Sequence, residues 1–324
     1  MFKSFLLAAG LGMSLFTGFA QATTLTVGDQ FYYSSTLLEL AGELKKLPYA
    51  LEFKRFNAGG PVVEALNTGS IDVGIVGDTP VIALAARGGP IKVLAVTRNQ
   101  LGGTAIVVGK DSGIQRVEDL AGKRVAIWKG SWSQQLVFSA LEKAGLPTDA
   151  PDYRYLMPTE ASAALSQGSV DAFASWEPYV SMQEKQGARI LVTAQGLMPA
   201  AVFVVANTRH LQEQRAAIGD FLARLQRARQ WSLQHTQGYA NAWADKNHSD
   251  PAIAKQWFER ERTQVEPITD KVLADAQTTA DFLVRAGVLS RPYDVKPLFD
   301  ATFNAFLTAT GAPVAQASSQ ERAP

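Results

Sequence analysis

Three short segments combine hydroxyl, indole and carboxyl side chains at points where a helix is expected to begin. Each segment follows an apolar run that is typical of a buried strand, and they read Asp78-Thr79-Pro80, Lys129-Gly130-Ser131-Trp132-Ser133 and Trp176-Glu177-Pro178. In open parallel sheets, ligands bind beyond the carboxyl ends of the strands. We therefore expect the three segments to face one cleft.

The chemistry predicted for that cleft is recognition of an anion. A helix N-terminus offers unpaired N–H groups and about half a positive charge, which favours an anionic group. A sulfonate fits well, because it has three acceptor oxygens and stays ionised. Thr79 is expected to be an N-cap with Pro80 at the first helical position, while Ser131 and Ser133 offer hydroxyl and N–H groups. Capping residues are common, so the prediction depends on three such starts occurring together.

The other side chains of these segments leave alternatives open. Trp132 and Trp176 would either wall the organic part of a ligand or pack the core. Asp78 and Glu177 would repel a bare anion. Their role could be to orient backbone amides, to close two lobes on each other or to receive an amine on the ligand.

Catalysis is not predicted. The chain has no Cys, and its three His residues (His210, His235 and His248) are scattered without metal-ligand spacing. Neither a G-x-S-x-G elbow nor a phosphate loop of the G-x-x-x-x-G-K type is present. We expect a binding protein with no metal and no cofactor.

The elements that must position these segments alternate between strand and helix up to residue 206. Helices are expected at 35–46, 133–144, 160–167 and 179–186, with two more opened by Pro61 and by Thr79-Pro80. Strands are expected at 25–27, 51–56, 73–76, 91–98, 105–108, 125–128, 153–156, 172–175, 190–193 and 202–206. This alternation implies an α/β protein with parallel-rich sheets covered by helices. Residues 211–308 have mainly helical spacing.

One pattern occurs twice. Residues 65–72 and 164–171 share the sequence Ala-Leu-x-x-Gly-Ser, then Ile or Val, then Asp. Each copy leads into a strand that ends in an acidic residue shortly before a Pro. The repetition predicts two similar halves in which Asp78 and Glu177 are counterparts.

The N-terminus reads as a secretory signal. Lys3 precedes an apolar run over residues 5–19, and Ala20-Gln21-Ala22 is a small-x-small cleavage site. The run is too short to span a bilayer, which takes about 20 residues. We expect residues 1–22 to be removed and the exported chain to have no lipid anchor, because no Cys follows the signal. Residues 312–324 are expected to form a loose tail.

Charge and length limit the partners. The 324 residues include 31 Lys and Arg against 30 Asp and Glu, with no basic block. This balance argues against a nucleic-acid footprint and against an electrostatic membrane anchor. The length suggests about two domains, and we expect a monomer.

Longer stretches resemble a known family, the periplasmic aliphatic-sulfonate-binding proteins, within a wider group that binds taurine and nitrate. The stretches are VGDQ (27–30), FNAGGPVVEALNTGSIDVGIVGDTP (56–80), VVGKDSGIQRVEDLAGKRVAIWKGS (107–131), LEKAGL (141–146), ALSQGSVDAFASWEPYV (164–180) and, more weakly, EPITDKVLADAQTTADFLVRAGVL (266–289). They cover nearly the whole chain after the signal.

The resemblance implies a type II periplasmic-binding-protein fold, in which two lobes are joined by two crossovers and the solute lies in the cleft. Residues 23–102 and 204–311 would form lobe 1 and residues 103–203 lobe 2, with crossovers near Gly102-Gly103 and near Ala201. The cleft residues that it implies are Gln30, Asp78, Thr79, Ser131, Trp176 and Glu177.

Two departures from the family pattern affect the expected ligand. Asp78 stands where Glu is more usual, and Trp132-Ser133 follow Ser131 where many relatives carry Asn or a smaller residue.

The resemblance also implies a role, which is delivery of an aliphatic sulfonate to the permease of an ABC importer in the periplasm for sulfur uptake. Taurine, a sulfate ester, nitrate and a thiamine-precursor pyrimidine are alternative ligands. An enzyme on this fold is the remaining alternative; it would need a Cys nucleophile or a His cluster, which the chain lacks.

Overall fold

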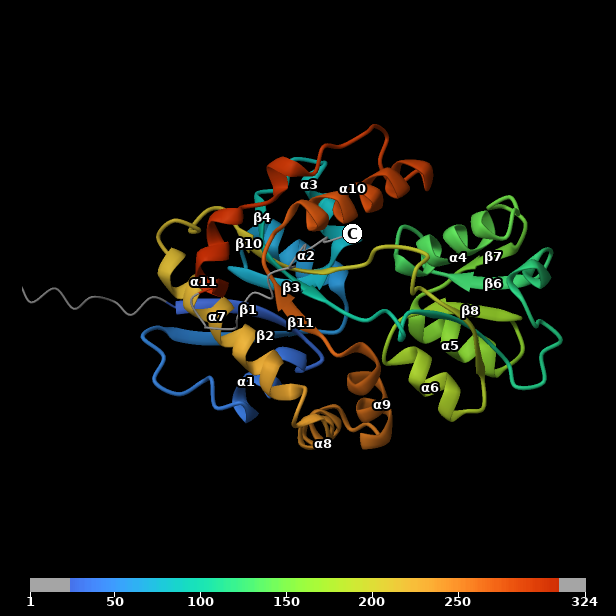
Figure 1. The fold of residues 1–324 in the computed structure, drawn as a ribbon, viewed down its shortest axis with the longest axis horizontal. Coiled ribbons are helices and arrows are strands. Elements are labelled where there is room, and N and C mark those ends of the chain that lie inside the picture. Colours follow the sequence, from blue (N-terminus) through green and yellow to red (C-terminus); the bar gives the residue numbers. More distant parts are fainter. Residues whose placement is uncertain (1–23, 309–324) are drawn as a thin grey trace, which may run out of the picture.

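The computed structural model describes residues 24–308, which form two α/β lobes lying side by side (Figure 1). The six strands of lobe 1 are β1 (Thr24–Gln30), β2 (Ala50–Phe56), β3 (Val73–Gly77), β4 (Ile91–Arg98), β10 (Val202–Asn207) and β11 (Gln264–Glu266). The five strands of lobe 2 are β5 (Ala105–Val108), β6 (Arg124–Ile127), β7 (Asp152–Tyr155), β8 (Ala172–Ser175) and β9 (Arg189–Thr193). The sheet orders are β11-β4-β10-β3-β1-β2 and β7-β6-β8-β5-β9.

Both sheets are mixed, with parallel and antiparallel pairs in each. β10 runs antiparallel to β3 and β4, and β5 runs antiparallel to β8 and β9. The reason is the route of the chain, which passes between the sheets over residues 99–104 and 194–201. β5 and β10 each follow such a passage, so they enter their lobe at the cleft and run away from the cleft. β3 and β8 run toward the cleft. Gly102-Gly103 and Ala201 lie in these two passages.

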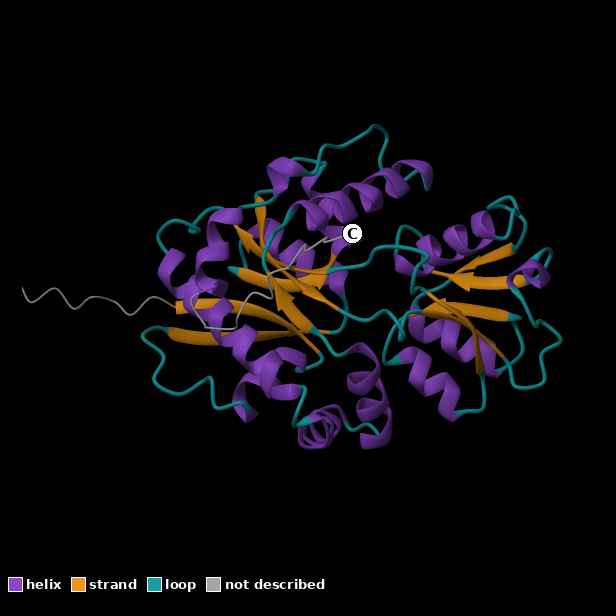
Figure 2. Ribbon diagram, viewed as in Figure 1, coloured by secondary structure: helices purple, strands orange, loops and turns teal. Residues whose placement is uncertain are grey.

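Helices cover both faces of each sheet (Figure 2). Those of lobe 1 are α1 (Tyr33–Leu40), α2 (Gly59–Thr68), α3 (Asp78–Ala85), α7 (Arg215–Ser232), α8 (Thr236–Asn247), α9 (Pro251–Glu261), α10 (Asp270–Arg285) and α11 (Asn304–Thr308). Those of lobe 2 are α4 (Trp132–Lys143), α5 (Pro158–Ser166) and α6 (Tyr179–Lys185). Because side chains alternate along a strand, Ile106 and Val108 of β5 pack in one core with α4, while Ala105 and Val107 pack in another with α5.

Two sequence expectations about elements were wrong, and a third was incomplete. The helix expected at 35–46 ends at Leu40, because Gly42 adopts φ 75° and the N–H groups of Gly42 and Glu43 bond back to Glu39 and Leu38, a glycine C-cap. The mainly helical C-terminal region also contributes a strand, β11, which pairs with β4. Thr79 is not an N-cap: Gly77 holds that position, with φ −56° and ψ 151°, and α3 begins at Asp78.

The repeated pattern is confirmed as two equivalent units. Asp72 precedes β3, and its carboxylate accepts hydrogen bonds from the N–H and hydroxyl of Thr26 in β1, at 2.7 and 2.6 Å. Asp171 precedes β8 and accepts from the N–H of Arg124 in β6 at 2.8 Å. Each Asp therefore ties the strand that follows it to the neighbouring strand of its own sheet, and β3 and β8 hold corresponding places.

The predicted signal (1–22) and tail (312–324) lie outside the described residues. Within the described part, none of the helices has the length and apolarity that crossing a membrane requires.

Candidate functional site: a cavity between the lobes

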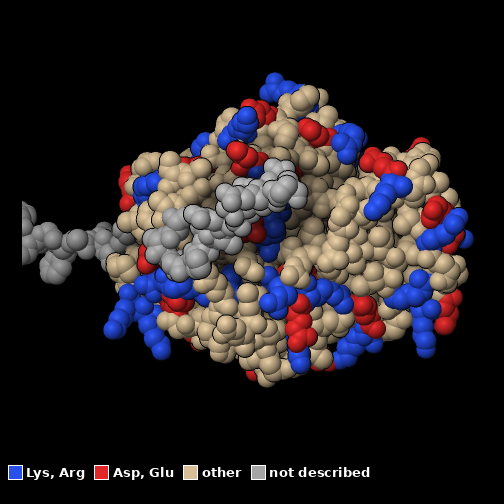
Figure 3. Space-filling view, in the orientation of Figure 1, with Lys and Arg blue, Asp and Glu red and all other residues tan. Residues whose placement is uncertain are grey.

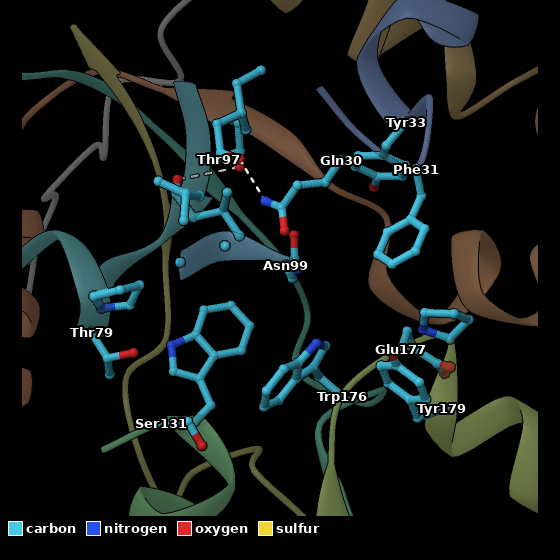
Figure 4. A pocket seen from close by; sticks show the side chains of 18 of the residues that line it. Gln30, Phe31, Tyr33, Thr79, Thr97, Asn99, Ser131, Trp176, Glu177 and Tyr179 are labelled. Carbon is cyan, nitrogen blue, oxygen red and sulfur yellow. Dashed lines mark hydrogen bonds between the residues drawn. The ribbon is translucent and has the colours of Figure 1, made fainter. Parts of the chain in front are cut away.

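A cavity of about 310 Å³ lies between the lobes and is lined by both (Figure 4). Its lining includes the ends of β1, β3 and β4, the starts of α2, α3 and α4, and the loop from β8 into α6. Thr79 and Ser131 stand on one side of the view, while Phe31, Tyr33, Glu177 and Tyr179 stand on the other. Such a volume suits a small organic molecule.

The structure brings most of the predicted site residues together. The six that line the cavity are Gln30, Thr79, Ser131, Trp132, Trp176 and Glu177. Asp78 and Ser133 are not among the lining residues; both are buried and serve other side chains. Ser133 Oγ accepts the N–H of Trp128 at 2.8 Å, so it shapes the loop before α4.

The start of α4 keeps two amides available on the cavity side. The N–H of Gly130 is taken by Gln134 Oε1 at 2.7 Å, and the N–H of Ser133 by Ser131 Oγ at 3.2 Å. The Ser131 hydroxyl donates to the carbonyl of Trp128 at 2.6 Å. Among the hydrogen bonds of the described residues, none engages the N–H of Ser131 or Trp132, and such amides suit an anion.

The start of α2 also lines the cavity, which the sequence did not predict. The helix expected to open at Pro61 begins two residues earlier, and its first residues, Gly59 and Gly60, line the cavity. The side chain of Gln30 lies beside them and donates to the carbonyl of Ile75 at 2.8 Å. A glycine pair just before an apolar helical run was the available signal, since glycine lets a ligand approach the backbone.

Aromatic rings make up much of the wall. Trp128 and Trp176 stack with ring centroids 6.2 Å apart, and Trp132 meets Trp176 edge-on at 6.4 Å. Across the cavity Tyr33 stacks on Trp257 at 4.9 Å. These rings provide an apolar surface for the organic part of a ligand, and Tyr33 and Trp257 were not predicted.

Asp78 bonds across the cleft. Trp132 Nε1 of lobe 2 donates to Asp78 Oδ1 of lobe 1 at 2.6 Å, and Thr279 Oγ1 of α10 donates to Oδ2 at 3.2 Å. Burial raises the pKa of Asp78 to about 6, against the effect of these hydrogen bonds. The two departures from the family pattern thus meet in one inter-lobe contact.

Glu177 of lobe 2 also bonds across the cleft, to a residue of lobe 1. Arg260 of α9 donates to Glu177 Oε1 at 2.8 Å and to Glu184 of α6 at 2.6 Å. Burial raises the pKa of Glu177 to about 6, against hydrogen bonds from Ser181 and the charge of Arg260. A Cβ on Gly103 would lie 2.4 Å from Glu177 Cγ, so this passage between the lobes requires glycine.

Glu261, the last residue of α9, is the least expected member of the site. It lines the cavity, is buried, and accepts hydrogen bonds through Oε2 from Trp257 Nε1 at 2.7 Å and Asn99 Nδ2 at 3.1 Å. Burial, with the nearby charge of Glu177, raises the pKa of Glu261 to about 8. No local sequence signal distinguishes it from the other charged residues of α9.

Residues 24–308 contain no group of three or more His, Asp or Glu placed to hold a metal ion. Figure 3 shows both signs of charge interspersed over this face of the molecule.

Comparisons with known proteins agree on a family. Residues 50–238 match the family described as NMT1/THI5 like. An Escherichia coli (strain K12) protein named for binding aliphatic sulfonates is 32% identical over 297 residues, which cover 90% of this chain and 93% of that one. The alkanesulfonate-binding protein from Xanthomonas axonopodis pv. citri, solved bound to MOPS, is similar with a TM-score of 0.78 and 28% identity, covering 87% and 99% of the two chains.

The same fold also occurs in an enzyme. A desulfurization enzyme has a TM-score of 0.67 and 18% identity, covering 89% of this chain and 99% of that chain. That likeness concerns the fold alone.

Proposed function

The chain belongs to the NMT1/THI5-like family, and we propose that it is a solute-binding protein of an ABC importer that captures an aliphatic sulfonate. The observation that carries this proposal is the cavity between the lobes, where the starts of α2, α3 and α4 are placed against aromatic walls. The amides would bind the sulfonate oxygens, and the rings would cover the organic part.

Closure of the two lobes is the proposed mechanism of capture. Lobe 1 would move as one body and lobe 2 as the other, hinged at the two passages between the sheets. A ligand shifts such an equilibrium only by binding the closed form better than the open form. Contacts from both lobes to one ligand satisfy that requirement.

The proposed setting is the periplasm, after removal of residues 1–22, with delivery to a membrane permease by a monomer. Catalysis is not part of the proposal. The chain has no Cys to act as a nucleophile, and none of its three His residues is among those that line the cavity.

A thermal-shift screen of the chain from Thr23 onward tests the function. The panel holds alkanesulfonates, taurine, an aryl sulfonate, a sulfate ester, sulfate, nitrate and a pyrimidine. A ligand present at about 100 times its Kd stabilises the native state by roughly 2.7 kcal/mol. We expect a shift with alkanesulfonates and none with sulfate or nitrate. A shift with nitrate or the pyrimidine alone would keep the fold and reject the ligand.

A further inference from the structure

Two consecutive aromatic residues between β1 and α1 adopt a left-handed backbone. Phe31 has φ 52° and Tyr32 has φ 57°, and they are the only neighbouring pair among the six residues other than glycine with positive φ in residues 24–308. Side chains crowd the backbone in this region, so a bulky residue there is rare and strained. Such strain persists only where the surrounding contacts enforce it, and it is concentrated at ligand-binding sites.

Three contacts hold this turn in place. The N–H of Phe31 donates to the carbonyl of Phe56 in β2 at 3.2 Å, and the carbonyl of Phe31 accepts a hydrogen bond from Asn247 Nδ2 at 2.8 Å. The guanidinium of Arg55 lies over the ring of Tyr32, 4.5 Å from its centroid. Asn247 ends α8 and is not among the residues that line the cavity, so its contact with the site runs through the backbone of Phe31.

The turn directs its two rings to different places. Phe31 lines the cavity, whereas Tyr32 does not. In Figure 4 the Phe31 ring stands on the side of the cavity opposite Thr79 and Ser131, where the sulfonate is proposed to bind. An apolar ring on that side would contact the tail of the ligand rather than its anionic group.

We propose that Phe31 determines the preference for the organic tail and that the strained turn serves to place its ring, with Asn247 as a positioning residue. This inference rests on the proposed function, because the sulfonate must occupy the helix starts for its tail to reach the ring. The preferred ligands are sulfonates with an apolar tail of several carbons. Methanesulfonate, whose organic part is a single methyl group, would leave the Phe31 ring uncovered.

The test compares the Kd values of hexanesulfonate and methanesulfonate, measured by calorimetric titration of the chain from Thr23 onward. Hexanesulfonate should bind the wild type more tightly. Phe31→Gly and Phe31→Ala should each reduce this preference about tenfold, which corresponds to lost contact with about two methylene groups. Tyr32→Gly and Tyr32→Ala are the matched controls, because they change an equally left-handed residue that does not line the cavity, and they should keep the wild-type preference.

A preference that survives in the Phe31 variants, or that falls equally in the Tyr32 variants, would overturn the inference. If an alanine variant does not fold, the glycine variants still decide the outcome, because glycine accepts a positive φ without strain. Failure of the proposed function is distinct, since neither sulfonate would then bind the wild type.

The strain of the turn is measured separately from the tail preference. Phe31→Gly and Phe31→Ala both lack the ring, but only alanine is strained at positive φ. Phe31→Gly should therefore unfold at a higher urea concentration than Phe31→Ala, and the same order is expected for the two Tyr32 variants. An equal or lower midpoint in the glycine variants would show that the turn is not strained.

Asn247→Ala tests the positioning role. It should reduce the tail preference severalfold, whereas Asn241→Ala, a change at an exposed residue of the same helix, should not. In a Phe31→Gly background, Asn247→Ala should reduce the preference no further, because the ring that it positions is gone. Wild-type preference in Asn247→Ala, or a further loss in the double variant, would show that Asn247 does not act through Phe31.

Discussion

At the residue scale, the site contains three buried acidic residues, of which two bond across the cleft and one faces the cavity. Asp78 and Glu177 bond across the cleft to Trp132 and Arg260, whereas Glu261 bonds within lobe 1 and faces the cavity. All three have raised pKa values because burial disfavours their charged forms. Glu261, with a pKa of about 8, is therefore mainly protonated at neutral pH when the site is empty.

The ligand-free protein should lose stability as the pH rises. The pKa of Glu261 is raised to about 8 in the folded state. Its contribution to folding is thus fully present below its unfolded pKa and is lost as the pH rises through 8. We expect Glu261 to account for a loss on the order of 2 kcal/mol between pH 6 and pH 8. Unfolding of the wild type and Glu261→Gln at both pH values checks this, and equal losses would contradict it.

The sequence predicted those site residues that stand next to helix-starting residues. It did not predict those that only the tertiary fold brings to the cavity. Thr79, Ser131 and Trp176 stand beside helix-starting residues, which made them visible. Glu261 and Trp257 sit in an ordinary amphipathic helix and reach the cavity because β11 pairs with β4 and places α9 beside it. Asp78 was recognised, but its burial behind Trp132 depends on contact between the lobes.

At the element scale, the start of α4 decides how the anion end is formed. Ser131 is the N-cap of this helix, and its hydroxyl both accepts from Ser133 and donates to Trp128. The cap thus fixes the loop whose amides face the cavity. The equivalent start of α3 has no side-chain cap, because its N-cap residue is Gly77.

Replacement of Ser131 should separate capping from backbone effects. Ser131→Ala is expected to lower the free energy of unfolding by about 1 kcal/mol, whereas Ser131→Gly should cost only a few tenths, because glycine tolerates an N-cap without a side-chain bond. Equilibrium denaturant unfolding measures both. Equal losses in the two variants would show that Ser131 does not stabilise α4 as a cap.

The strand order was accessible from the sequence only in part. The repeated Gly-Ser-x-Asp turn predicted that β3 and β8 are counterparts. It carried no information on β5 and β10, whose direction follows from entry at the cleft rather than from their own residues. The Gly42 that ends α1 is a recognisable C-cap signal in the sequence, and the helix predicted at 35–46 extends past it.

At the scale of the whole molecule, the contacts between α6 and α9 hold the lobes together. Arg260 bridges Glu177 and Glu184, Gln256 donates to Glu184 at 2.9 Å, and Lys185 pairs with Asp250. Asp78 and Trp132 close the opposite side of the cavity. Ligand binding and lobe closure should therefore depend on the same contacts.

Loss of Arg260 should weaken capture. In Arg260→Gln the buried Glu177 loses its cation, and a buried charge without its partner costs several kcal/mol, roughly 3–5. We expect the Kd for a bound sulfonate to rise about tenfold or more and the ligand-free radius of gyration to increase. Calorimetry and solution scattering check this against Lys255→Gln, a change at a partly exposed residue of α9. Wild-type affinity in Arg260→Gln would show that this bridge does not stabilise the closed form.

The most direct test of the account is a calorimetric titration of the chain from Thr23 onward with propanesulfonate and, separately, with inorganic sulfate. The account predicts saturable binding of one propanesulfonate per chain and no measurable binding of sulfate, because the cavity binds both the anionic group and the organic tail. Binding of sulfate with no binding of propanesulfonate would contradict it.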